Sequence, residues 1–277
     1  MSYNLPEGTV RKLVATAFTN HTSTARFVGL AVGPHTPLAD VARTVERQVF
    51  EETFGMDAAA MSAEYRRYED DSLFFVVLDR RTGLPAGAAR VIDGGGKTLD
   101  DAPDCIDVPL STIVGLHDLH TGRIWDFATL AVLPAYRGVR AGVAVSAMLY
   151  RTFLNAGRLA GVRHIVAMLD HRAHRNLKLI GVEFTPMAGS DPVEYLGSSS
   201  TEALHVLFDD LEPSIARQCE RLRQNTANTG EIDGRGLRRL LTRRTAARVA
   251  YQVHSGMGLD EHILLPALDR RRLIRQR

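Results

Sequence analysis

The sequence predicts a mixed α/β fold, with a mostly antiparallel sheet covered by helices on both faces and followed by a C-terminal helical appendix. Residues 72–78 and 86–92 are apolar runs on either side of a polar turn, which is typical of a β-hairpin. Residues 123–132 and 162–169 flank a helical pattern, which predicts a βαβ unit with parallel strands. Beyond residue 210 the patterns are helical and basic.

In the N-terminal half, residues 1–22 have weak patterning and are expected to form a loose or helical lead-in. Residues 24–32 are rich in apolar and β-branched types and predict a strand. Residues 38–54 place apolar side chains at helical spacing, and Gly55 is the expected stop. Residues 100–115 are acidic and contain proline, so we expect a loop with one short helix at most.

The C-terminal half continues with alternating elements. Helices are predicted over residues 141–156 and 173–180, and strands over 182–186 and 203–208. Three basic helices follow, predicted over residues 211–223, 235–251 and 264–275. The chain is therefore divided into a lead-in (1–22), a central domain (23–210) and a basic helical C-terminal extension (211–277).

The composition is that of an ordinary globular protein, with 45% apolar and 24% charged residues among 277. It excludes a disordered chain, a collagen-like chain and a disulfide scaffold. No membrane span is expected, because no run of about 18 apolar residues occurs. The N-terminus lacks a secretory signal pattern, and only Cys105 and Cys219 are present, so we expect a cytoplasmic protein.

The most specific segment is the turn over residues 133–140 (LPAYRGVR), which joins a predicted strand to a predicted helix. The first turn of such a helix has free main-chain N–H groups, which bind phosphate. Gly138 and Gly142 allow a ligand to approach closely. Arg137 and Arg140 add positive charge. The turn therefore predicts a phosphate site, and a plain surface turn is the alternative.

This turn resembles the signature of the GNAT acyltransferase superfamily, Arg/Gln-x-x-Gly-x-Gly/Ala after a central strand. The match is Arg137-Gly138-Val139-Arg140-Ala141-Gly142, with arginine in place of the middle glycine. Residues 174–184 (HRNLKLIGVEF) are similar to the superfamily's next helix and its closing turn. The resemblance covers roughly residues 25–208 and implies a GNAT-like domain.

The resemblance also implies a co-substrate, either acyl-CoA or acyl-phosphopantetheine on acyl carrier protein. The residues expected to contact this co-substrate are Leu130, Ala131, Val132, Arg137, Gly138, Val139, Arg140, Ala141, Gly142 and Asn176. For Asn176, a polar contact within its helix is the alternative. The superfamily's general-acid tyrosine falls on Leu177 and is therefore absent.

Three segments show a narrower resemblance, to acyl-homoserine lactone synthases and long-chain N-acyl amino acid synthases. They contain Arg47 (ERQVFEETFGM), Arg90 (GAARVI) and Asp126 (IWDFATLAV). The third departs from the group's pattern, with aspartate for glutamate and Phe-Ala for a Ser-Arg pair. The resemblance implies transfer of a fatty acyl group to an amine of a small molecule such as an amino acid. It places Arg47, Phe50 and Arg90 at the substrate, and ion pairs are the alternative for both arginines.

Amide formation from a thioester requires a base for the amine proton and a donor for the oxyanion. Asp126, on a central strand beside the turn, is the candidate base, and a structural acid paired with an arginine is the alternative. His171 follows a predicted strand end and is a candidate helper in proton transfer. The pairs His117/His120 and His171/His174 lack an evident third ligand, so no metal is expected.

The C-terminal extension is basic: residues 211–277 hold 14 arginines and 7 acids, a net charge of +7. A solvated helical surface is the default interpretation. Docking of an acidic acyl carrier protein is the functional alternative, and peripheral membrane contact by the last residues is another. Nucleic acid is not an expected partner, because Tyr251 is the extension's only aromatic residue. Two further functions remain open, a non-catalytic GNAT-like binding module and a protein N-acetyltransferase.

Overall fold

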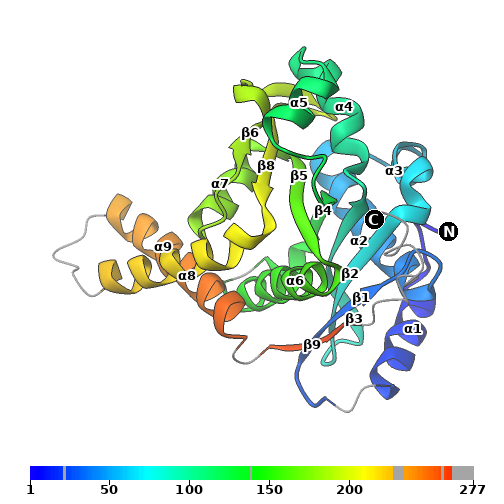
Figure 1. The fold of residues 1–277 in the computed structure, drawn as a ribbon. Helices are drawn as coiled ribbons and strands as arrows, with labels where there is room; N and C mark the ends of the chain where they lie inside the picture. The colour runs from blue at the N-terminus through cyan, green and yellow to red at the C-terminus, as the bar shows by residue number, and fades with distance from the viewer. Residues whose placement is uncertain (21–22, 138, 227–233, 257–258, 264–277) are drawn as a thin grey trace.

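The protein is built on one sheet, shown in the computed structural model of Figure 1, which describes residues 1–277 except 21–22, 138, 227–233, 257–258 and 264–277. The strands are β1 (Phe27–Val32), β2 (Ser72–Asp79), β3 (Leu84–Asp93), β4 (Arg123–Val132), β5 (Val162–Asp170), β6 (Thr185–Pro186), β7 (Val193–Tyr195), β8 (Ser198–Leu207) and β9 (Asp260–Ile263). Their order is β6-β8-β5-β4-β3-β2-β1-β9, and β7 pairs with β8. The pairs β4–β5 and β1–β9 are parallel and the other pairs antiparallel, which confirms the predicted sheet.

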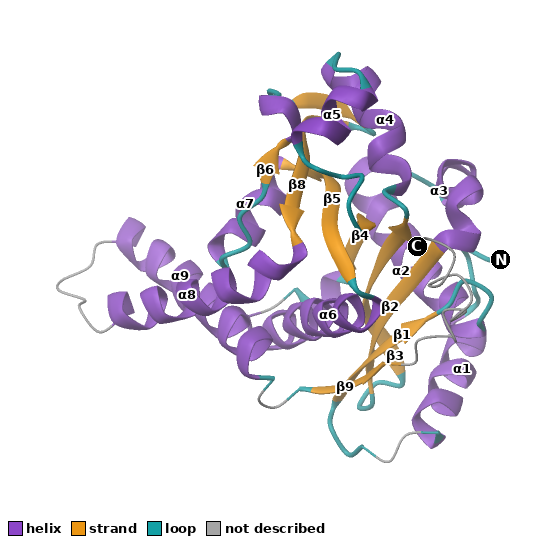
Figure 2. Ribbon diagram, in the orientation of Figure 1, coloured by secondary structure: helices purple, strands orange, loops and turns teal. Residues whose placement is uncertain are grey.

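Helices cover both faces of this sheet (Figure 2). They are α1 (Glu7–Thr19), α2 (Pro37–Phe54), α3 (Ala58–Tyr65), α4 (Gly96–Ile106), α5 (Leu110–Leu116), α6 (Val139–Ala160), α7 (His171–Leu179), α8 (Phe208–Thr226) and α9 (Gly234–Ser255), with short 3-10 segments η1 (Arg66–Asp71), η2 (Pro134–Tyr136) and η3 (Met187–Gly189). Helices α1 and α2 pack on one face, and α6, α8 and α9 on the other. Within the described chain, no helix has the length and apolar content needed to cross a bilayer.

Strand β2 shows why the sheet is a sandwich between two helical layers. All of its residues are buried, and they alternate between two cores. Phe75 and Val77 belong to the core with α6, whereas Phe74 and Val76 belong to the core with α1 and α2. Successive side chains of a strand point to opposite faces, so an unbroken apolar run is what a strand buried on both sides needs.

The lead-in contains a regular helix, α1, which is one of the two forms expected for it. The structure differs from the sequence-based expectations in the acidic segment after β3, which forms two helices, α4 and α5. Leu99 and Ala102 of α4 face a small apolar core, which stabilises a helix that the proline and the acids had argued against. Strand β9 was not expected. The helix predicted over residues 264–275 lies outside the described part of the chain.

The C-terminal extension returns to the sheet instead of standing apart from it. Helices α8 and α9 pack against α6, and β9 then pairs with β1 at the sheet edge. Arg151 of α6 holds this return: its Nη1 donates to the carbonyls of Val253 (2.9 Å) and His254 (3.1 Å) at the end of α9. Its Nε lies 3.4 Å from the carboxylate of Glu261 in β9. One arginine therefore ties α6, α9 and β9 together.

A buried ion pair joins α2 to the middle of the sheet. Arg90 of β3 and Glu46 of α2 are both 0% exposed and lie 2.7 Å apart. Arg90 also donates to the Tyr3 hydroxyl (2.8 Å), and Thr129 of β4 donates to the other Glu46 oxygen (2.5 Å). Burying charges is costly unless every charge is paired, so Glu46 neutralises Arg90 and fixes the distance between α2 and the sheet.

Replacing Glu46 with alanine should destabilise the fold strongly. The Arg90 guanidinium would remain buried without its main partner, which typically costs about 3–5 kcal/mol. Urea unfolding followed by circular dichroism measures the loss. The control is Glu51→Ala, which removes an exposed partner of Arg47 and should change stability by less than about 1 kcal/mol. Equal effects of the two substitutions would contradict the role given to Glu46.

Candidate active site

Strands β4 and β5 begin as a parallel pair and then separate. Their pairing ends where Asp126 lies opposite Val166, and β4 continues in the sheet with β3 alone. Directly after this point Ala128 forms a β-bulge, because Phe127 and Thr129 pair with β3 and Ala128 is skipped. A bulge bends its strand and redirects the side chains around it. The result is an opening in the sheet, next to which α6 and α7 begin.

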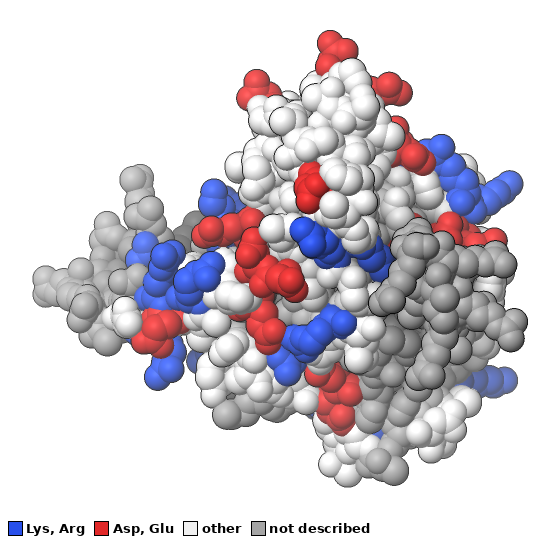
Figure 3. Space-filling model, viewed as in Figure 1, with Lys and Arg blue, Asp and Glu red and all other residues white. Residues whose placement is uncertain are grey.

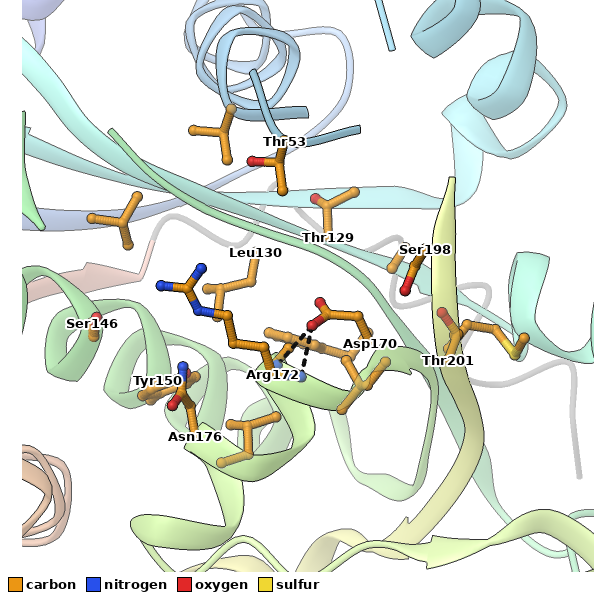
Figure 4. Close-up of a pocket in the computed structure, with 18 of the residues that line it drawn as sticks. Thr53, Thr129, Leu130, Ser146, Tyr150, Asp170, Arg172, Asn176, Ser198 and Thr201 are labelled. Carbon is orange, nitrogen blue, oxygen red and sulfur yellow. Dashed lines mark hydrogen bonds between the residues drawn. The ribbon is translucent and has the colours of Figure 1, made fainter. Parts of the chain in front are cut away.

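A cavity of about 770 Å³ occupies this opening. Figure 4 shows that side chains from β4, β5, α6 and α7 point into it. On one side the wall continues to α2, the start of α4 and the β7–β8 hairpin, and on the other side it continues to α9. Segments that are far apart in the sequence therefore enclose one space.

The phosphate-binding turn predicted from the sequence lies at one end of this cavity. Gly142 is required there, because a Cβ at this position would lie 2.8 Å from the carbonyl oxygen of Tyr136. Arg137 lines the cavity and is held by two contacts, to the carbonyl of Val132 (2.9 Å) and to the carboxylate of Glu52 (3.1 Å). We call the end of the cavity lined by Arg137, Gly142 and Arg172 the mouth.

Arg172 of α7 was missed by the sequence analysis. Asp170 caps α7 by accepting hydrogen bonds from the main-chain N–H of Arg172 (2.8 Å) and of Ala173 (3.0 Å). The Arg172 side chain then extends into the cavity, as Figure 4 shows. No carboxylate in the described chain forms an ion pair with it, so this guanidinium is available to an anionic ligand. The signal in the sequence is an acidic N-cap followed by arginine at a strand end.

The expected co-substrate residues divide into three groups. Leu130, Val132, Arg137, Gly142 and Asn176 line the cavity. Ala131 and Ala141 do not: Ala131 is 0% exposed in the core below β4, and Ala141 packs against the core with α6. Gly138 lies outside the described residues. Val139 and Arg140 begin α6, and the structure describes no side chain for them.

Asp126 is the strongest candidate for a reactive group. It is 0% exposed, lines the cavity and accepts two hydrogen bonds from Thr98, one from the main-chain N–H and one from the hydroxyl, both 2.8 Å long. Burial raises its pKa to about 7, and the Thr98 hydrogen bonds and the charge of Lys97 only partly oppose this. A carboxyl group with a pKa near neutrality is suited to exchange protons at physiological pH.

Around Asp126 the cavity wall is polar and acidic. Lys97 lies between the carboxylates of Glu64 and Asp101, and the Tyr195 hydroxyl donates to Asp101 (2.6 Å). Two carboxylates therefore neutralise one ammonium. We call this part of the cavity, lined by Lys97, Thr98, Asp126, Tyr195, Ser198 and Thr201, the polar arm.

Three expected site residues lie elsewhere, and Phe50 is the predicted substrate residue that does line the cavity. Arg90 is buried in the ion pair with Glu46. Arg47 pairs with Glu51 (2.6 Å) and lies outside the cavity wall. For both arginines the structure corresponds to the ion-pair alternative. His171 is exposed at the first position of α7 and is not among the residues that line the cavity.

The two histidine pairs serve separate local contacts. His117 accepts a hydrogen bond from the main-chain N–H of Ala188 (3.1 Å), and His120 lies 3.2 Å from Asp118. His174 lies 2.5 Å from the Glu202 carboxylate. Among the residues that the structure describes, no three side chains of His, Cys, Asp or Glu come together as a metal site.

The raised pKa of Asp126 predicts a pH-dependent stability. The unfolded carboxyl loses its proton near its ordinary pKa of 3.8, whereas the folded one keeps it up to about 7. Between these values only the folded state holds the proton, so stability falls as pH rises. From about pH 5 to about pH 7 the parent should lose about 1.4 kcal/mol per pH unit relative to Asp126→Asn, measured by urea unfolding. Parallel stability curves of the two proteins would contradict this pKa.

A scan against protein-family models and a search of curated proteins find no match. Among solved structures, the chain is similar to FeeM, an N-acyl amino acid synthase from uncultured soil microbes, with a TM-score of 0.52 and 13% identity over 69% of this chain and 96% of that chain. It is also similar to the AHL synthase LasI, with a TM-score of 0.49 and 12% identity over 69% of this chain and 95% of that chain. At an identity this low, structural similarity shows a shared fold and does not show a shared activity. The chain has the GNAT-like fold that the resemblance of its sequence implied.

Proposed function

We propose that the protein is an N-acyltransferase that moves an acyl group from a thioester donor to an amine of a small molecule. The observation that carries this proposal is the position of Asp126. A buried carboxyl with a pKa of about 7 lies on the wall of the same cavity as Arg172 and the start of α6. A base near neutrality and a phosphate-binding mouth on one cavity are what amide formation from a phosphopantetheine thioester needs.

The donor that fits the mouth is an acyl-CoA or an acyl-phosphopantetheine on acyl carrier protein, since both carry phosphate next to a pantetheine arm. The Arg172 guanidinium and the first N–H groups of α6 bind the phosphate. The Arg137 side chain adds a second cation once it leaves Glu52, with which it pairs across the mouth. The pantetheine arm lies along β4 after Ala128, where β5 no longer pairs with this strand.

The reaction follows from these positions. The amine nitrogen attacks the thioester carbonyl carbon while Asp126 accepts the amine proton. A main-chain N–H of β4 beside the bulge stabilises the oxyanion. The C–S bond then breaks, and the thiolate leaves as the amide forms. Leu177 stands where the superfamily resemblance implies an acid, so the thiolate leaves without a proton from that position. The proton stays on Asp126, so the negative charge passes from this carboxylate to the thiolate.

The acceptor is a small amine such as an amino acid, and the acyl group is a fatty chain. The polar arm beside Asp126 receives the amine. The larger part of the remaining wall is apolar, which suits a chain of methylene groups. Docking of acyl carrier protein on the basic extension stays a prediction. Figure 3 shows basic side chains interspersed with acidic ones near α8, and residues 264–277, expected at a membrane surface, lie outside the described chain.

Arg172→Ala should weaken CoA binding by at least about 10-fold, because it removes a charge-assisted contact to phosphate. Thermal shift with free CoA measures this: the parent at 100 times its Kd should gain about 2.7 kcal/mol. Arg175→Ala is the control, since Arg175 is exposed on the same helix and lies off the cavity wall. The Arg137→Ala/Arg140→Ala double variant should also bind less well. Double-variant binding equal to that of the parent would contradict the phosphate site.

Asp126→Asn should lower kcat by at least about 100-fold while leaving CoA binding intact, because it removes the base and not the phosphate contacts. In the parent, kcat/KM should rise with pH through about 7, as Asp126 loses its proton. Release of free thiol, measured with acyl-CoA and a panel of amines, follows turnover. Acyl-CoA binding without turnover of any amine would favour a binding module. Acylation of peptide N-termini alone would favour a protein acetyltransferase.

A further inference from the structure

The C-terminal helix α9 forms part of the cavity wall, although it follows the GNAT-like part of the sequence. Three helices meet at this end of the cavity, and each presents residues spaced by three and four positions, which lie on one helix face. The lining residues are Val143, Ser146 and Tyr150 of α6, Ala173, Asn176 and Leu177 of α7 with Ile180 directly after it, and Thr242, Thr245, Ala246 and Val249 of α9. One face of α9 therefore lines the cavity, as one face of α6 and one face of α7 do.

Apolar side chains predominate at this end, which distinguishes it from the polar arm. Val143, Tyr150, Leu177, Ile180, Ala246 and Val249 form its apolar surface, which we call the apolar arm, and Ser146, Asn176, Thr242 and Thr245 lie beside it on the same wall. Ala246 is 5% and Val249 7% exposed, so this wall is shielded from solvent. No charged side chain of α9 lines it among the residues described. A chain of methylene groups that extends from the opening along these apolar side chains buries apolar surface there and leaves no polar group of its own unpaired.

Helix α9 is also held firmly at this place. Ala250 and Val253, one and two turns after Ala246, are buried in the core with α6. At its end, Arg151 binds two α9 carbonyls and the carboxylate of Glu261 in β9. A wall fixed in this way has a defined distance from the opening between β4 and β5, so it can measure the length of a bound chain.

We infer that α9 closes the apolar arm and that the small side chain of Ala246 sets the length of the acyl chain that the enzyme accepts. The inference rests on the proposed acyl transfer and adds a specificity-determining residue to it. Alanine contributes a single methyl group to the wall, so any larger side chain there takes space directly from the chain end. Val249, one turn further, limits the arm in the same way.

The experiment is a chain-length profile, with kcat/KM measured for a series from acetyl-CoA to palmitoyl-CoA and with the Kd of each donor measured by calorimetry. Ala246→Phe should lower kcat/KM for the longest donors that the parent uses by at least about 10-fold, and should change that for acetyl-CoA by less than about 2-fold. Val249→Ala should shift the profile toward longer chains. Arg248→Phe, on the exposed side of α9, is the matched control and should leave the profile unchanged.

Circular dichroism and thermal unfolding establish that each variant folds, and Val249→Ala tests the arm without added bulk. Equal profiles for the parent, Ala246→Phe and Val249→Ala would overturn the role of α9 while the proposed acyl transfer stands. A parent that turns over no donor would overturn the proposed function instead. The inference is then judged by binding alone: Ala246→Phe should weaken palmitoyl-CoA and spare free CoA, and equal losses for both ligands would overturn it.

Discussion

The separation of β4 from β5 is the constraint on which the rest of the molecule depends. Main-chain N–H and C=O groups in a sheet interior must be paired, so two neighbouring strands part only where something else occupies the space. Here they part after Asp126, and a cavity of about 770 Å³ follows. Helix α6 begins near this opening, and the first N–H groups of a helix have no partner within it, while β4 supplies an edge. A ligand with amide and phosphate groups along its length satisfies both.

The buried ion pair keeps that opening in place. Glu46 accepts a hydrogen bond from Thr129, which directly follows the bulge residue Ala128, and it pairs with Arg90, which lies opposite Thr129 in β3. The network therefore holds the bulge at a fixed position against α2. Arg90 was expected to contact the substrate, but it does not line the cavity. It helps to orient the strand that borders the cavity. The resemblance to a family pattern was enough to single out Arg90. Its structural role became clear only from the side chains that contact it in the folded protein.

A feature could be predicted from the sequence when the residues that determine it are close together along the chain. The turn before α6 was predictable because its strand, arginine, glycine and helix are contiguous, and Gly142 is needed for a contact with Tyr136, only six residues before it. Lys97, Tyr195 and Ala246 were not predictable as cavity residues, because they come from segments distant in sequence and only the tertiary fold brings them together. Strand β9, with the sequence DEHI, has no period-two apolar pattern. Its place is determined by pairing with β1 and by Arg151, which no local signal contains.

In the proposed reaction, the charges of the polar arm would let one carboxyl both attract and deprotonate an amine. Lys97 is offset by Glu64 and Asp101, so this arm has no free cation among the described residues, while Arg172 is placed at the mouth. An amine arrives from water as an ammonium, which this acidic surface favours. Its charge lowers the pKa of Asp126 from about 7, because an opposite charge stabilises the ionised carboxylate. The bound ammonium then releases one proton to water, which frees the nitrogen lone pair for attack, and the Asp126 carboxylate accepts the second proton as the amide forms. Burial thus raises the pKa of Asp126 toward neutrality, and a cationic acceptor bound beside it favours the carboxylate that acts as the base.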